Sequence, residues 1–173
     1  MQTKKGVKLY NVIFPLWLLW LIPITWLVVL PANFLIDLAV VVLTLKFLQV
    51  PDIKKITKKV ILKVWALGFI ADFIGTAAMF MANIIEFDYQ TNLGKWWYEN
   101  ITNAVYYNPF DNIYALIWVT VCVVLTAYCI YFLNYKISLR KTELNHDLRK
   151  KLALSLAIFT APYLFYLPTA WFF

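Results

Sequence analysis

The chain has 173 residues, of which 63% are hydrophobic and only 14% are charged, and its mean hydropathy is +0.71. A soluble domain is about half apolar and roughly a quarter charged, so a soluble protein of this size could not bury so much apolar surface. The formal net charge is +7, but the positive charges fall in short connecting segments, which argues against a nucleic-acid groove and for attraction to anionic lipid. We therefore predict an all-α membrane protein, a single integral membrane domain built as a bundle of about five transmembrane helices.

The first two predicted spans lie at about 9–30 and 32–50. The earlier run is too long for a signal-peptide core and lacks a small-residue cleavage site, so we expect it to be retained. Pro31 is expected to end it, because proline removes a backbone hydrogen bond and clashes with the preceding turn. Residues 30–33 should then form a tight, uncharged turn into the second span.

The three later spans are predicted at about 60–85, 112–135 and 152–173. Segment 86–111 is rich in Trp and Tyr, and we expect it to lie on the outer membrane interface. In the last span, Thr160 and Pro162 are candidates for a helix break near the middle of the bilayer, where freed carbonyls could coordinate a cation or a substrate. The alternative is a packing kink in which Thr160 satisfies its own backbone.

The basic residues predict the orientation of the chain. Three lie in the N-terminal tail, six within 46–63 and six within 136–151, which makes fifteen of the sixteen. Lys95 alone falls in segment 86–111, together with four acids. Because positively charged loops stay in the cytosol, we expect a cytosolic N-terminus and an external C-terminus, and five alternating spans reproduce this pattern.

Two acids, Asp37 and Asp72, lie inside apolar spans. A charged group at the bilayer centre costs several kcal/mol, so such residues face protein or water and are functional candidates. No basic residue lies in mid-span to pair with either acid, and their positions along neighbouring helices put them roughly 10 Å apart in depth. They could line one polar path together with side chains on the same helix faces, namely Asn33, Thr44, Thr76 and Asn83.

Three interpretations of the acids remain open. They could form an ion or proton pathway centred on Asp72, or they could be neutral groups that tie helices together by hydrogen bonds. Asp37, which is the shallower of the two, could instead reach external water. The sequence does not decide among these interpretations.

Signatures of other site types are missing from the sequence. No Cys, His or acid cluster has metal-ligand spacing, so no metal site and no cofactor is expected. Nucleophile motifs, glycine-rich phosphate loops and paired catalytic acids are also missing, so we name no catalytic residue and regard an enzyme as the less favoured class.

Three function classes follow. The first is a small multi-pass channel or transporter subunit that moves a cation or protons past the intramembrane acids, as a homo-oligomer or within a larger membrane complex. The second is a non-catalytic accessory or structural subunit that packs against a larger membrane partner. The third is a membrane-embedded lipid-handling protein or enzyme with a lateral cleft beside Asp37 or Asp72. The lack of targeting patterns favours a plasma membrane, in particular a bacterial cell membrane, with anionic lipids as partners on the cytosolic face.

Overall fold

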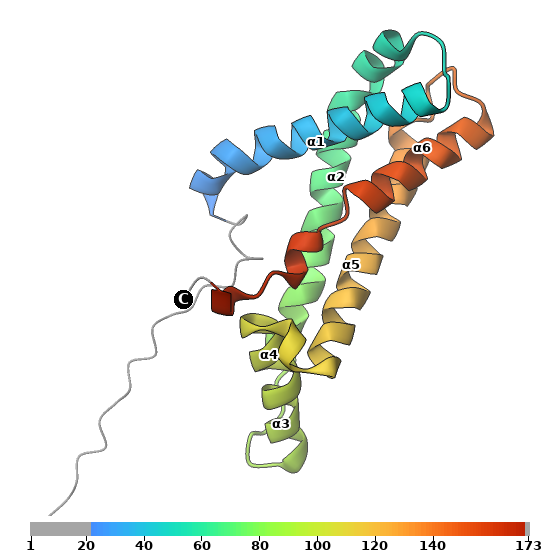
Figure 1. Cartoon of the computed structure of the whole chain (residues 1–173). Helices are drawn as coiled ribbons and strands as arrows, with labels where there is room; N and C mark the ends of the chain where they lie inside the picture. Colours follow the sequence, from blue (N-terminus) through green and yellow to red (C-terminus); the bar gives the residue numbers. More distant parts are fainter. Residues whose placement is uncertain (1–21, 172–173) are drawn as a thin grey trace, which may run out of the picture.

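The computed structural model describes residues 22–171, and every regular element among them is helical (Figure 1). Three of the helical stretches are long and apolar enough to cross a membrane, namely Trp26–Phe47, Ile53–Ile84 and Ile113–Ser138. The helices are α1 (Trp26–Phe47), α2 (Ile53–Ile84), α3 (Asn92–Trp97), α4 (Asn103–Tyr107), α5 (Ile113–Leu133) and α6 (His146–Phe159).

Helices α2 and α5 lie side by side and run in opposite directions, and they form the long axis of the molecule (Figure 1). Small residues allow this contact. A Cβ atom added at Gly75 of α2 would collide with the hydroxyl of Thr126 on α5 and would lie 3.1 Å from the ring of Phe165. Thr126 is fully buried, and its hydroxyl donates a 2.8 Å hydrogen bond to the Cys122 carbonyl. Close backbone approach at small residues is how helices associate in membranes.

Helices α1 and α6 pack against this pair at one end of the bundle, and α1 crosses α2 obliquely (Figure 1). The α1–α2 and α5–α6 connections meet at this end, where Lys55 Nζ lies 2.9 Å from Glu143 Oε1. The hydrogen bond and the charge of Lys55 lower the pKa of the exposed Glu143 carboxyl. The apolar cluster below these connections contains Val41, Leu45, Val60, Val64, Ile130, Leu152 and Leu156.

The opposite end of the bundle is aromatic. Helix α3, a π-helical turn at Tyr98–Thr102 and helix α4 follow one another without a break and pack against the start of α5. The hydroxyl of Thr102 donates a 2.8 Å hydrogen bond to the Ala82 carbonyl and so fixes this segment to the end of α2. Edge-to-face ring contacts join Phe87 to Trp97, Tyr89 to Tyr98, Trp96 to Tyr114, and Trp97 to Trp118.

The C-terminal part of the chain is a broken helix. Helix α6 begins at an Asn145 cap, whose side chain accepts a hydrogen bond from the Leu148 amide, and it ends at Phe159. Two short 3-10 turns follow, Tyr163–Tyr166 against α5 and Thr169–Trp171 against α4. Residues 146–171 therefore run from the end with the basic connections to the aromatic end.

The structure differs from the prediction for the first two spans. Helix α1 begins at Trp26 and continues through Pro31, so the turn predicted at residues 30–33 is not present. Pro31 is the sixth residue of α1, so it removes one backbone hydrogen bond inside the helix. Apolar membrane helices tolerate such an interruption. Residues 9–21 of the predicted first span lie outside the described residues.

Candidate functional site

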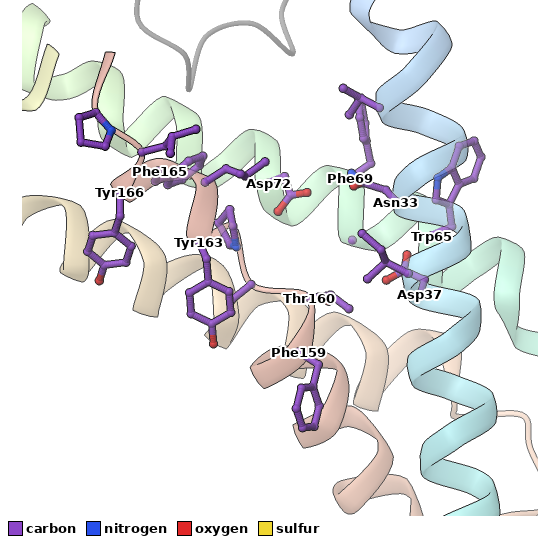
Figure 2. Close-up of a pocket in the computed structure, with 18 of the residues that line it drawn as sticks. Asn33, Asp37, Trp65, Phe69, Asp72, Phe159, Thr160, Tyr163, Phe165 and Tyr166 are labelled. Atoms are coloured by element: carbon purple, nitrogen blue, oxygen red, sulfur yellow. The ribbon is translucent and has the colours of Figure 1, made fainter. Parts of the chain in front are cut away.

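A cavity of ≈ 710 Å³ lies between α1, α2 and the chain that follows α6 (Figure 2). It exists because α1 and α6 meet α2 and α5 at an angle, which leaves space beside the crossing point. Its lining residues are Val29, Asn33, Ile36, Asp37, Trp65, Gly68, Phe69, Asp72, Phe110, Phe159, Thr160, Ala161, Pro162, Tyr163, Leu164, Phe165, Tyr166, Leu167, Pro168 and Trp171.

The two intramembrane acids share this cavity. Asp37 of α1 is 6% exposed, and a Cβ atom added at Gly68 of α2 would lie 3.7 Å from its Oδ2 atom. Asp72 follows Gly68 by one helical turn, which is about 6 Å along α2, and the two carboxyl groups interact electrostatically. In Figure 2 both carboxyl groups point toward the same space. The separation of the two acids along the helix axes is therefore smaller than the roughly 10 Å expected from the sequence.

Within residues 22–171, the surroundings of the acids offer no positive charge. None of the residues that line the cavity is Lys, Arg or His. The Oδ1 atom of Asp72 is buried and has no hydrogen-bond partner among the described residues. A buried carboxylate without a cationic or hydrogen-bonding partner is energetically costly. Asp72 therefore carries, beside the cavity, an acceptor atom for which the described part of the chain supplies no donor.

Aromatic contacts hold α1 against α2 beside the acids. The Trp65 indole Nε1 donates a 3.1 Å hydrogen bond to the Leu30 carbonyl, so the polar atom of this ring is satisfied across the interface. The Trp65 ring also meets Phe34 edge-to-face at 6.2 Å, and Trp26 meets Phe69 in the same way at 6.2 Å. These contacts fix the angle between the helices and thereby the width of the cavity.

The break after α6 forms the remaining wall. The Thr160 hydroxyl donates a 2.8 Å hydrogen bond to the Leu156 carbonyl, within its own helix. The backbone turns at Pro162, and the hydroxyl of Tyr163 reaches back to the Ile158 carbonyl at 2.6 Å. Two carbonyls near the end of α6 are therefore satisfied by local side chains, and the acids are the charged groups that face the cavity.

Five of the eight residues singled out from the sequence line the cavity, and three do not. Those in the cavity are Asn33, Asp37, Asp72, Thr160 and Pro162. Thr76 is buried beside Gly75 in the part of α2 that packs on α5, Asn83 lies at the far end of α2, and Thr44 lies further along α1, toward the basic connections. Of the polar stripe expected along α2, only Asp72 therefore lines the cavity, although Thr76 follows it by one turn and is buried.

The aromatic walls were not predicted as part of the site. Trp65, Gly68, Phe69 and Asp72 have the spacing i, i+3, i+4 and i+7 of a single helix face, and this pattern could have revealed the α2 wall. The walls supplied by the residues after α6 depend on the helix break and on its path, for which the sequence contains no comparable pattern.

The chemistry open to this site is limited by its ligand set. No group of three or more His, Cys, Asp or Glu side chains within residues 22–171 could hold a metal ion. Within these apolar surroundings the two carboxyl groups can exchange a proton. Together with the Asn33 amide oxygen they can also bind one cation. Comparison with known proteins found no matching family model, curated protein or solved structure.

Proposed function

We propose that the chain is a small multi-pass membrane transporter or channel subunit that moves a cation or protons past Asp37 and Asp72. The observation that carries this proposal is that both acids line one cavity whose lining residues include no basic side chain. Ionisable groups within membrane segments are costly and are usually kept for ion or proton handling.

The proposed step is an exchange at the two carboxyl groups. When a cation occupies the cavity, its charge compensates a carboxylate that would otherwise be buried alone. When the cation leaves, a proton on the same carboxyl group removes the uncompensated charge. Asn33, also in the cavity wall, supplies an amide that can donate to one acid or accept from the ligand.

We also propose that the broken C-terminal helix is a membrane crossing, with the N-terminus cytosolic and the C-terminus external. In support, the basic start of α2 and the basic α5–α6 connection lie at the same end of the bundle, where the Lys55–Glu143 ion pair joins them. Such connections favour the cytosolic face and its anionic lipids. The three long apolar helices are consistent with a membrane location, and we propose the cell membrane, with copies of the chain associating through their exposed apolar faces.

The test is a flux measurement in proteoliposomes with dyes sensitive to H⁺, Na⁺ and K⁺. We expect the wild-type chain to conduct at least one of these ions above protein-free vesicles, and we expect the double variant Asp37→Asn/Asp72→Asn to lose at least nine-tenths of that flux. The matched control is Asp147→Asn, which makes the same chemical change at a side chain that is 83% exposed, and it should conduct like the wild type. Equal flux through the double variant would exclude the two acids as the pathway.

A second candidate is a lipid-handling protein, and the specific observation in its favour is the apolar character of most of the cavity wall. Mass spectrometry of the chain released from mild detergent distinguishes the two. A co-purifying acyl lipid, together with wild-type vesicles that show no ion flux, would favour lipid handling. Absence of both flux and lipid would favour an accessory subunit.

A further inference from the structure

The cavity is larger and more aromatic than a site for a bare ion needs to be. Its volume of ≈ 710 Å³ lies within the range of roughly 300–1,000 Å³ typical of pockets for drug-sized molecules. Eight of its twenty lining residues are aromatic: Trp65, Phe69, Phe110, Phe159, Tyr163, Phe165, Tyr166 and Trp171. A hydrated inorganic cation would leave most of this wall without contacts.

The rim of the cavity is apolar as well. Ile36, Phe159 and Leu164 line the cavity and are 48%, 67% and 73% exposed, respectively. Side chains of this kind belong in contact with hydrocarbon in a chain with several apolar spans. A ligand that first partitions into the bilayer can therefore reach the cavity from the side without crossing a polar surface.

From these features, and resting on the proposed function, we infer that the substrate class is an amphiphilic organic cation, a molecule with one positive charge on an apolar, aromatic-sized body. The charged end lies between Asp37 and Asp72, where the buried Oδ1 atom of Asp72 has no partner. The body lies against the aromatic wall, whose ring faces attract cations as well as apolar groups. Phe69, one turn before Asp72 on α2, also lines the cavity (Figure 2), so its ring would contact the ligand beside the charged end.

Other ligand classes fit less well. An anion of the same size would be repelled by the two carboxyl groups. A neutral acyl chain would fill the apolar part but would leave the acids without a partner. Only a molecule that combines positive charge with apolar bulk satisfies both parts of the wall.

The experiment compares two probes of closely similar size and shape but opposite charge, tetraphenylphosphonium and tetraphenylborate. Equilibrium dialysis against the purified full-length chain in detergent measures saturable binding of each. We expect the wild type to bind the phosphonium saturably and the borate only non-specifically. Asp37→Asn/Asp72→Asn should weaken phosphonium binding at least tenfold, whereas Asp147→Asn should bind like the wild type. Phe69→Leu, which keeps apolar volume but removes the ring, should weaken it about threefold.

The outcomes separate this inference from the proposed function. Saturable binding of both probes alike, or phosphonium binding that survives in the double variant, would contradict the inference. If neither probe binds but the acids still carry H⁺, Na⁺ or K⁺ flux, the inference fails and the proposed function stands. If there is neither binding nor acid-dependent flux, both fail. Circular dichroism of each variant establishes that lost binding does not reflect lost folding.

Discussion

Replacing Asp37 and Asp72 together by asparagine is expected to raise the Tm of the detergent-solubilised chain by about 5 °C, although the same variant is expected to lose ion flux. The reason is that both carboxyl groups lie in an apolar cavity whose lining, among the residues the structure describes, includes no basic side chain. Translocon-based scales place the cost of an intramembrane Asp at about 3 kcal/mol, of which a neutral amide removes a part. For a chain of this size, an increase of about 2 kcal/mol in the free energy of unfolding corresponds to the expected rise in Tm.

The stability measurement distinguishes a functional role for the acids from a structural one. If Asp37 and Asp72 serve mainly to hold α1 against α2 through hydrogen bonds, their replacement should lower the Tm. Each buried hydrogen bond between the helices would contribute about 1 kcal/mol or more to stability. Thermal unfolding is followed by circular dichroism and by the fluorescence of the Trp residues. The control Asp147→Asn should lower the Tm by no more than about 2 °C, because it removes only a favourable charge from the first turn of α6. A lower Tm in the double variant would make the acids structural.

Gly75→Ala is expected to lower the Tm by about 6 °C, because the added methyl group has no room at the α2–α5 contact. The new Cβ atom would collide with the Thr126 hydroxyl, and it would lie 3.2 Å from the Thr126 Cβ and 3.1 Å from the Phe165 ring. Thr126 cannot easily move aside, because it is fully buried and branched at Cβ and its hydroxyl is bonded to Cys122. Overpacking of this kind typically costs about 1–3 kcal/mol.

The matched control is the same substitution at Gly68, two turns earlier on the same helix. At Gly68 the nearest atom to an added Cβ is Asp37 Oδ2 at 3.7 Å, which is an ordinary van der Waals contact. Gly68→Ala should therefore stabilise α2 by up to about 1 kcal/mol, because alanine favours the helix. Combining Gly75→Ala with Thr126→Ala should recover part of the loss, since the closest contact is removed. Equal effects at Gly68 and Gly75 would contradict the α2–α5 packing described above.

The helical content and the long apolar helices could be predicted from the sequence because hydrophobic length is a strong signal. Runs of about twenty apolar residues predict Ile113–Ser138 to within three residues at each end. Helix α2 begins at Ile53, seven residues before its predicted start, because the basic residues that were expected to form a loop continue its first two turns. The error at Pro31 has a physical reason. Pro31 lies inside α1 and removes one backbone hydrogen bond without ending the helix, as membrane-spanning helices tolerate. The number of crossings and their orientation remain predictions.

From the sequence, the site could be predicted only as two intramembrane acids and a helix break, without their arrangement in space. Asp37 and Asp72 stand out because charge is rare in apolar segments, and Thr160 and Pro162 because proline interrupts a helix. That these four residues meet in one cavity depends on the oblique crossing of α1 over α2, which side-chain packing at Trp65 and Phe34 determines. Such a crossing angle is a property of two surfaces together, and neither helix alone encodes it.

The central claim is that Asp37 lies against Gly68, one turn from Asp72, so that both acids face one cavity. Cross-linking of the double variant Asp37→Cys/Gly68→Cys tests it most directly. In this variant Cys122 and Cys129 are replaced by alanine, and a protease site is inserted into the α1–α2 connection. After treatment with a short bis-methanethiosulfonate reagent and then protease, the two fragments should stay joined until a reductant is added. The control pair Asp37→Cys with Thr76→Cys, two turns further along α2, should separate. Fragments of the Gly68 pair that separate like those of the control pair would contradict the shared cavity.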